Sequence, residues 1–375
     1  MCSYKADRSL TTLLKKHNNI NQDHEVLKSL NLSKVILPVL IGLGVILYMV
    51  FSQFDVAEFS KIKWNRRLWY FLGIAVLVYV LRHLFYAYRL KILSDHDFTF
   101  KHAIELVFIW EFASAISPTS IGGSAVAVFF LSQEKISAAK AVSIVLYTVI
   151  VDSFFFLVSL VILLSTFGPV LIRPDMTSMF QGYGITFILV WLFILFYGGV
   201  LLWGLYRPRF IKRLLMGMAR LPLIRRFKQG LYQIGQDVVI TSQELRTKPL
   251  GFHVKAILLT IGAWVTRFVA VNFIIMALVE TDWTLMEQFL MYARSQTMYV
   301  ITQFSPTPGG SGVLELMFSG FFKDFISPGL GSVAALLWRL ITYYPYLIIG
   351  ALIIPNWISR VLKQRKNLEY EQSGG

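Results

Sequence analysis

Charge and cysteine are both scarce in this sequence of 375 residues. Only 15% of the residues are charged, whereas a soluble globular domain carries about a quarter. The hydrophobic fraction is 56% and the mean hydropathy is +0.61, which predict a polytopic α-helical membrane protein. The one cysteine, Cys2, excludes an intramolecular disulfide. The first apolar run begins only near Val35 and no small-residue cleavage pattern follows it, so a cleavable signal peptide is not expected.

Acidic residues are the scarcer of the two charges, 21 against 36 Lys and Arg, which gives a net charge of +15. In a membrane protein such an excess marks cytoplasmic loops, so no nucleic-acid partner is expected. Residues 207–255 hold eleven basic residues against two acidic ones. This segment and both basic tails are therefore expected on the cytoplasmic side of a bacterial inner membrane. Loop 54–67 disagrees, because it is expected outside yet carries Lys61, Lys63, Arg66 and Arg67.

Two of the apolar segments, 104–131 and 288–323, are interrupted near their middles by proline and glycine. As one straight helix the second would be roughly 50 Å long, against a hydrocarbon core of ~30 Å. Each is therefore expected to be a re-entrant pair of half-helices. The full set of apolar segments is 35–54, 68–90, 104–131, 137–166, 185–206, 254–279, 288–323 and 330–353.

The two interruptions have related sequences, since both read Ser-Pro-Thr followed shortly by Gly-Gly-Ser. Proline breaks a helix and glycine permits unusual turns. Irregular backbone at membrane depth is tolerated only where protein buries it or a wet cavity solvates it. Both breaks are therefore expected to line a substrate path. They read Ser117-Pro118-Thr119-Ser120-Ile121-Gly122-Gly123-Ser124 and Ser305-Pro306-Thr307-Pro308-Gly309-Gly310-Ser311-Gly312-Val313-Leu314-Glu315.

Spacing and charge parity favour two halves of the membrane region, each ordered helix, helix, broken segment, helix. If both broken segments are re-entrant, both termini are cytoplasmic. Arg82 and Arg267 then occupy equivalent positions, because nearly the same length of chain separates them as separates the starts of the two breaks. The second half would be inverted relative to the first, as in transporters that bind substrate between repeats. The predicted organisation is a cytoplasmic tail 1–34, a first repeat 35–166, an external loop 167–184, a second repeat 185–353 with an amphipathic cytoplasmic insertion 207–253, and a cytoplasmic tail 354–375.

Ionisable residues within apolar segments are costly to bury and are therefore candidates for function. Glu315 would begin the second half-helix, where a carboxylate meets the positive end of the helix dipole, either as part of the path or only as a cap. Asp152 and Arg339 are expected either to form a structural ion pair or to handle a headgroup or proton. Arg267 and Arg294 either line the path or snorkel to an interface. The candidates are Glu111, Asp152, Arg267, Arg294, Glu315 and Arg339, with Arg82 nearer an interface.

Enzymatic signatures are sparse. The six histidines show no metal-ligand spacing, and there is no phosphate-binding loop or nucleophile elbow. Ser117 and Ser305 have no histidine nearby in sequence, so helix capping is their expected role. The protein is therefore not expected to be an enzyme, and no catalytic residue, cofactor or metal is assigned.

At these residues the sequence resembles the lysylphosphatidylglycerol synthase transmembrane region, a flippase-like family, from about residue 35 to 355. The resemblance lies in Pro306–Gly312 with Glu315, in the Ser117-Pro118 break with Gly122 and Gly123, and in Arg339-Leu340-Ile341-Thr342-Tyr343-Tyr344 followed by Gly350. It implies movement of lipids or lipid-linked groups between leaflets. Members that make lysyl-lipids add a soluble domain, so that synthesis is not expected here. Many members have Glu-Arg where this chain has Thr148-Val149.

The expected function is therefore lipid transport across the inner membrane. Arginines outnumber acids in the apolar segments, and arginine binds phosphate bidentately, so the headgroup is expected to be anionic or phosphate-bearing. Two alternatives stay open: an accessory membrane protein for a lipid- or glycan-synthesis enzyme, and an intramembrane enzyme acting on lipid headgroups. A membrane lipid is the expected partner, with a second copy of the chain or a lipid-synthesis enzyme as further candidates.

Overall fold

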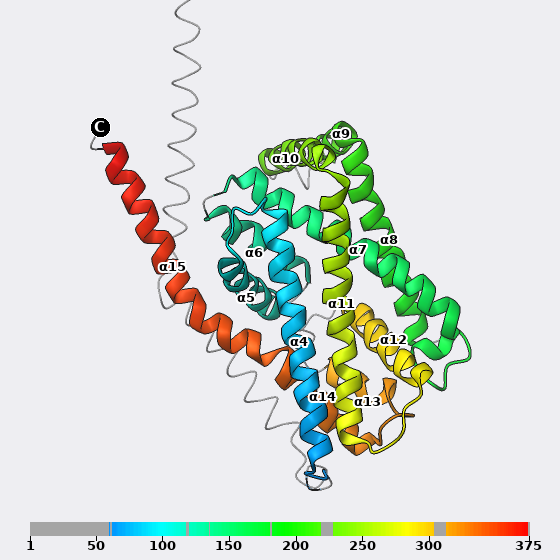
Figure 1. The fold of residues 1–375 in the computed structure, drawn as a ribbon. Coiled ribbons are helices and arrows are strands. Elements are labelled where there is room, and N and C mark those ends of the chain that lie inside the picture. Colours follow the sequence, from blue (N-terminus) through cyan, green and yellow to red (C-terminus); the bar gives the residue numbers. More distant parts are fainter. Residues whose placement is uncertain are drawn as a thin grey trace, which may run out of the picture.

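The computed structural model describes Ser60 and residues 62–117, 120–134, 136–180, 182–218, 228–303 and 313–373. Within these residues the fold is all-helical, as expected (Figure 1). The expected tail 1–34, the expected span 35–54 and the centre of the second break, 304–312, lie outside the described residues. The elements are α4 (Arg66–Leu93), α5 (Phe100–Ile116), α6 (Ser120–Ser132), α7 (Ala138–Phe167), the 3₁₀ turn η1 (Gly168–Leu171), α8 (Tyr183–Tyr206), α9 (Pro208–Met218), α10 (Lys228–Thr247), α11 (Leu250–Leu278), α12 (Leu285–Thr302), α13 (Val313–Phe321), α14 (Pro328–Thr342) and α15 (Tyr344–Ser373).

Several helices are long and apolar enough to cross a membrane, which confirms a multi-pass membrane protein. Five such stretches occur within the described residues: Arg66–Leu93, Ala139–Leu171, Tyr183–Val200, Leu250–Leu278 and Leu330–Gln364. The last of these does not form one helix, because α14 ends at Thr342 and α15 begins at Tyr344. Residues 354–373, expected as a tail, continue α15 past Pro355.

Helices α4 and α11 pack along each other and form the centre of the bundle (Figure 1). A small residue permits their close approach, since a Cβ atom on Gly262 would lie 3.0 Å from the Phe85 ring. Further along the pair, the Tyr86 and Trp264 rings meet edge to face at 6.2 Å.

One end of the bundle is fastened by contacts between the start of α4 and the end of α11; we name it the Glu280 end. Glu280 accepts hydrogen bonds from Asn65 Nδ2 at 2.5 Å and Lys63 Nζ at 3.3 Å. Arg67 donates to the backbone oxygens of Met276, Val279 and Thr281, which lie in and just after the last turn of α11, where carbonyls lack intrahelical partners. These contacts give two of the four unexpected basic residues of loop 54–67 a local structural role.

The opposite end, which we name the Asp95 end, is fastened by a second set of charges. Asp95 lies 2.5 Å from Lys248 Nζ and 3.3 Å from Lys140 Nζ, and Lys140 also contacts Asp97 at 2.7 Å. Burial opposes ionisation of Asp95, but the hydrogen bonds from the two lysines outweigh it and hold the pKa of this carboxyl below its usual value. The loop before α5 and the starts of α7 and α11 are thus held together.

The described residues of the basic insertion include two helices, α9 and α10, that cross the bundle at this same Asp95 end (Figure 1). Helix α9 packs against α10, and α10 in turn contacts α7 and α8. Arg209, Phe210 and Arg213 of α9 are exposed. A helix that presents both basic and apolar side chains suits the surface of an anionic leaflet, which stays a prediction for this pair.

Each interrupted segment contains two helices among the described residues. Segment 104–131 covers α5, which ends at Ile116, and α6, which begins at Ser120; segment 288–323 covers α12, which ends at Thr302, and α13, which begins at Val313. Gly122 and Gly123 lie in the first turns of α6, whereas residues 118–119 and 304–312 lie outside the described residues. Each pair folds back on itself. His102 near the start of α5 lies 3.1 Å from Glu134 beyond α6, and the rings of Trp283 before α12 and Phe325 after α13 are 5.9 Å apart.

The two hairpins therefore open toward opposite ends of the bundle. The α5–α6 hairpin begins beside the Asp95 end, and its open end is tied to α15 by Arg360, whose Nη1 lies 3.0 Å from Glu105. The α12–α13 hairpin begins a few residues after Glu280. The depth of both hairpins in a bilayer stays a prediction.

The first break depends on the absence of a side chain at Gly123. A Cβ atom there would overlap Ser114 Oγ and lie 2.9 Å from Ser114 Cα, so α6 approaches α5 closely at this point. Backbone atoms cannot move aside as a flexible side chain can. The expected need for close backbone approach is met at Gly123, whereas Gly309 and Gly310 lie outside the described residues.

Gly123→Ala should therefore destabilise the folded protein by ~1–3 kcal/mol through overpacking. Gly73→Ala is the matched control, because a Cβ atom there has nothing within 4 Å, and alanine favours the helix interior. The measurement is the unfolding temperature of the purified protein in detergent. A Gly123→Ala protein as stable as the Gly73→Ala control would contradict the close contact.

The two ends should also be distinguishable by cysteine labelling in a Cys2→Ser background. Thr281→Cys at the Glu280 end should react with a membrane-impermeant thiol reagent from one side of sealed vesicles. Ser137→Cys and Arg246→Cys, exposed near the Asp95 end, should react only from the other side. Labelling of all three from one side would show that these ends do not lie on opposite sides of the membrane.

Candidate functional site

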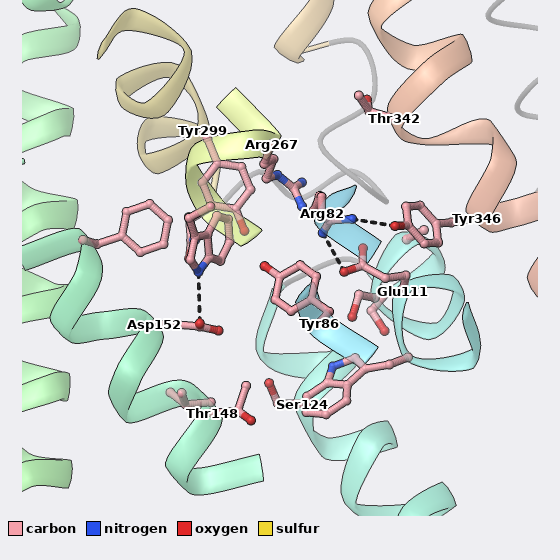
Figure 2. A pocket seen from close by; sticks show the side chains of 18 of the residues that line it. Arg82, Tyr86, Glu111, Ser124, Thr148, Asp152, Arg267, Tyr299, Thr342 and Tyr346 are labelled. Atoms are coloured by element: carbon pink, nitrogen blue, oxygen red, sulfur yellow. Dashed lines mark hydrogen bonds and ion pairs between the residues drawn. The ribbon is translucent and has the colours of Figure 1, made fainter. Parts of the chain in front are cut away.

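A cavity of about 360 Å³ lies among the long helices, at the place where the two broken segments meet (Figure 2). Ser117 and Ser124 line it from the first break. Gln303 and Leu314, which flank the second break, line it as well. The remaining walls come from α4, α5, α7, α8, α11, α12, α14 and the first turn of α15. Both breaks therefore border one cavity between the two halves of the chain.

Arg82 of α4 forms the most buried charged contact of this cavity. Its Nη2 lies 2.6 Å from Glu111 Oε1 and its Nη1 donates to the Tyr346 hydroxyl at 2.8 Å (Figure 2). The rings of Tyr79 and Tyr86 lie 4.9 and 4.7 Å from its guanidinium carbon, within cation–π distance. Arg82 is 0% exposed and lies inside the bundle, whereas its depth in the bilayer, expected nearer an interface, stays a prediction.

Asp152 of α7 also has a cationic partner. Its Oδ1 lies 2.5 Å from Arg89 Nη1 and accepts a second hydrogen bond, 2.9 Å long, from Trp264 Nε1. Arg89 donates in turn to Thr260 at 2.8 Å. Arg339 was expected as a possible ion-pair partner of Asp152, but in the structure the partner of Asp152 is Arg89. Arg89 lies one turn before the end of α4. At that position the sequence alone does not distinguish a buried arginine from one that is exposed to solvent.

Arg267 of α11 extends toward Arg82 (Figure 2). Its guanidinium carbon lies 4.7 Å from the Tyr299 ring centre and 5.4 Å from that of Trp264. Across the part of the chain that the structure describes, no carboxylate lies within ion-pair distance of its nitrogens. Two guanidinium groups therefore adjoin one carboxylate, Glu111, and Arg267 contributes an uncompensated positive charge to the cavity.

The described cavity lining is positively charged as a whole, because it contains four arginines and two carboxylates. Neutral donors and acceptors accompany them, including the hydroxyls of Ser114, Ser153 and Thr302. The arginines are Arg82, Arg89, Arg267 and Arg339, and the carboxylates are Glu111 and Asp152. Such a wall suits an anionic, oxygen-rich group.

Arg339 of α14 is buried and also lines this cavity. It is 4% exposed, and its guanidinium carbon lies 4.8 Å from the Tyr343 ring centre. Glu111, Asp152, Arg267 and Arg339, four of the six candidate intramembrane charges, thus line one cavity. Spacing along the sequence identified them, and the folding of both halves brings them together.

Arg294 of α12 lies outside this set. It donates to the backbone oxygens of Val170 at 3.1 Å and Phe321 at 2.9 Å, and it pairs with Asp324. These oxygens belong to the ends of η1 and α13, where carbonyls lack intrahelical partners. Arg294 is 0% exposed and neither lines the path nor snorkels, so we assign it a structural role.

Other candidates of the sequence analysis are only partly described. Pro118 and Thr119 lie outside the described residues, as do Ser305, Pro306, Thr307, Pro308, Gly309, Gly310 and Gly312. Gly122 is part of α6 and Glu315 part of α13. The orientation of the Glu315 side chain is not among the described features, so its role stays a prediction.

Comparison with known proteins covers all the helices around the cavity. The model of the family described as the lysylphosphatidylglycerol synthase TM region matches residues 35–350. A UPF0104 membrane protein from Archaeoglobus fulgidus is 28% identical over 315 residues, which cover 79% of this chain and 90% of that protein. No solved structure matches the chain significantly.

The contact between Arg82 and Glu111 should be essential to stability. Glu111→Ala leaves the buried guanidinium without its carboxylate, which costs ~3–5 kcal/mol in comparable buried pairs. Glu280→Ala is the matched control, because Glu280 and its partner Lys63 are both exposed, and removing such a pair changes stability little.

The unfolding temperature in detergent distinguishes the two variants. We expect a large decrease for Glu111→Ala and almost none for Glu280→Ala. Equal decreases would mean that Glu111 is not required to compensate Arg82.

Proposed function

The chain belongs to the family of the lysylphosphatidylglycerol synthase transmembrane region, and from this premise we propose that its cavity carries the polar headgroup of a lipid from one leaflet to the other. The observation that carries the proposal is that the described lining of the cavity contains four arginines and two carboxylates among apolar spans. Burying a charged side chain in apolar surroundings costs free energy, and such residues commonly mark a substrate or ion pathway. A membrane-embedded polar cavity provides a headgroup with hydrogen bonds that hydrocarbon cannot.

Correspondences between the two halves support an inverted repeat around this cavity. The N-caps of α5 and α12 are both threonines, Thr99 and Thr284, which are as far apart in sequence as Arg82 and Arg267. Those of α7 and α14 are both serines, Ser137 and Ser327, at nearly the same separation. The hairpins open toward opposite ends of the bundle. Such repeats suit alternating access, in which one half moves against the other around a shared site.

The charge of the cavity favours an anionic headgroup. Arg267 has no carboxylate partner among the described residues, and a guanidinium binds a phosphate through two parallel hydrogen bonds. Helix α6 begins at Ser120 and α13 at Val313, and residues one turn or less from these starts line the cavity. Helix N-termini add positive potential there. The substrate class is therefore a lipid with a phosphate or similarly anionic headgroup.

The proposal also includes an orientation of the protein in the membrane and a role that is not enzymatic. The Asp95 end, with its basic helices α9 and α10, faces the cytoplasm, and both termini lie on that side of the plasma membrane. The broken segments are re-entrant from opposite leaflets. No catalytic residue or cofactor enters the proposed process, and the partner is the membrane lipid itself.

Transport of fluorescent lipids in reconstituted liposomes tests this function. Arg267→Gln should lower the rate for an anionic phospholipid about tenfold or more, because a hydrogen bond to a charged group contributes roughly 1.5–3 kcal/mol. Arg209→Gln, an exposed change on α9, is the matched control and should leave the rate unchanged. Unlabelled anionic lipid should compete more strongly than zwitterionic lipid.

An unchanged rate in the Arg267→Gln protein would overturn the proposed role of the cavity. Stronger competition by a zwitterionic or cationic lipid would overturn the charge preference alone.

A further inference from the structure

We infer that the cavity opens sideways into the hydrocarbon through a mouth at Phe193, Ile194 and Tyr197 of α8, where the acyl chains of the lipid leave while the headgroup stays inside. The inference rests on the proposed function in taking the ligand to be a lipid. It adds a binding subsite with its own chemistry, an apolar channel for hydrocarbon chains. We name these three residues the α8 mouth.

Exposure marks the mouth. Among the described residues that line the cavity, Phe193 and Tyr197 are the two that are more than a third exposed, at 41% and 38%. Ile194 between them is 9% exposed and also lines the cavity. A side chain that borders the cavity and is exposed outside lies where the cavity meets its surroundings. The opening is therefore on α8 rather than at either end of the bundle.

The surroundings of this opening are apolar. Helix α8 contains no charged residue from Tyr183 to Tyr206, and its stretch Tyr183–Val200 is a candidate membrane span. The α8 mouth lies just past the middle of that stretch. Its exposed neighbours are Leu189, Leu192, Leu195 and Phe196. A group that leaves through this mouth enters lipid chains rather than water, which suits an acyl chain and not a free anion.

Two packing contacts hold the side chains of the α8 mouth in place. The rings of Phe193 and Tyr197, one helical turn apart, stack with an interplanar angle of 4° and centres 6.0 Å apart. Beside them Gly198 lies against α7, since a Cβ atom there would be 3.1 Å from Ser153 Cβ. Ser153 lines the cavity as well. The two stacked rings therefore form one side of the opening. The adjacent Gly198 packs them close to α7, the helix that carries Asp152.

The cavity lining thus combines a polar part with an apolar part at α8. Arg267, Asp152 and Ser153 supply the polar part, and Phe156 and the α8 mouth supply the apolar part. An amphipathic ligand matches both parts at once, with its anionic group at Arg267 and its chain at Phe193. Inorganic phosphate would use only the first part.

A bulky group fixed at the mouth should block the lipid. In a Cys2→Ser background, Tyr197→Cys is modified in detergent with a benzophenone maleimide and reconstituted into liposomes containing fluorescent phosphatidic acid. Transport should fall at least about tenfold relative to the unmodified Tyr197→Cys protein. Phe193→Cys, treated in the same way, gives a second test if the first variant folds poorly. Phe196→Cys is the matched control, because Phe196 is 70% exposed on the same helix and does not line the cavity.

The outcomes separate this inference from the proposed function. Loss of transport with modified Tyr197→Cys and with Arg267→Gln, but not with modified Phe196→Cys, supports both. Loss with Arg267→Gln alone overturns the mouth and leaves the headgroup site. Equal loss with modified Tyr197→Cys and Phe196→Cys overturns the mouth, because the modification then acts without regard to place.

A final experiment distinguishes an anionic group that belongs to a lipid from a free phosphate ion. Liposomes loaded with inorganic phosphate should show no protein-dependent release of it. If they release phosphate, and modification of Tyr197→Cys does not slow this release, the cavity conducts a soluble anion. That result would overturn the acyl-chain exit.

Discussion

A guanidinium group buried among apolar helices must be compensated, and the arrangement of this protein depends on how that is done at Arg82. Its partners come from three elements: Glu111 of α5, Tyr79 and Tyr86 of α4, and Tyr346 of α15. Satisfying one charge therefore fixes the first hairpin and the last helix against the central pair. Gly350 of α15 adds to this, since a Cβ atom there would lie 2.5 Å from Phe112 Cβ. Charge and close packing together hold the first break beside the cavity.

The breaks could be predicted from the sequence because their cause is local. Proline and glycine act on the residues that carry them, so α5 and α12 end where the motifs predict. The partners of the buried charges could not be predicted in the same way. Whether Asp152 meets Arg89 or Arg339 depends on the rotation of α4 and α14 about their axes, which packing sets. The contacts of Arg82 could not be predicted for the same reason, since position along a helix gives depth but not the direction of the side chain.

Counting charges along the loops predicts which segments share a side of the membrane, with one discrepancy at loop 54–67. The structure gives two basic residues of that loop local partners. Lys63 pairs with Glu280, and Arg67 donates to three carbonyls in and just after the last turn of α11. These contacts fasten α4 to α11, so a structural role accounts for basic residues in a loop that is expected outside.

Arg82 and Arg267, which the proposed repeat would place at equivalent positions, differ in their surroundings, and this difference bears on the proposed function. Arg82 has a carboxylate, a tyrosine hydroxyl and aromatic faces, whereas the described surroundings of Arg267 supply aromatic faces without a carboxylate. A carboxylate beside Arg267 would stabilise the fold but would also neutralise the charge that attracts an anion. Sites that bind ligands commonly retain such a cost to stability. On the proposed function, the anionic partner that the described residues do not give Arg267 is the headgroup that it receives from the membrane.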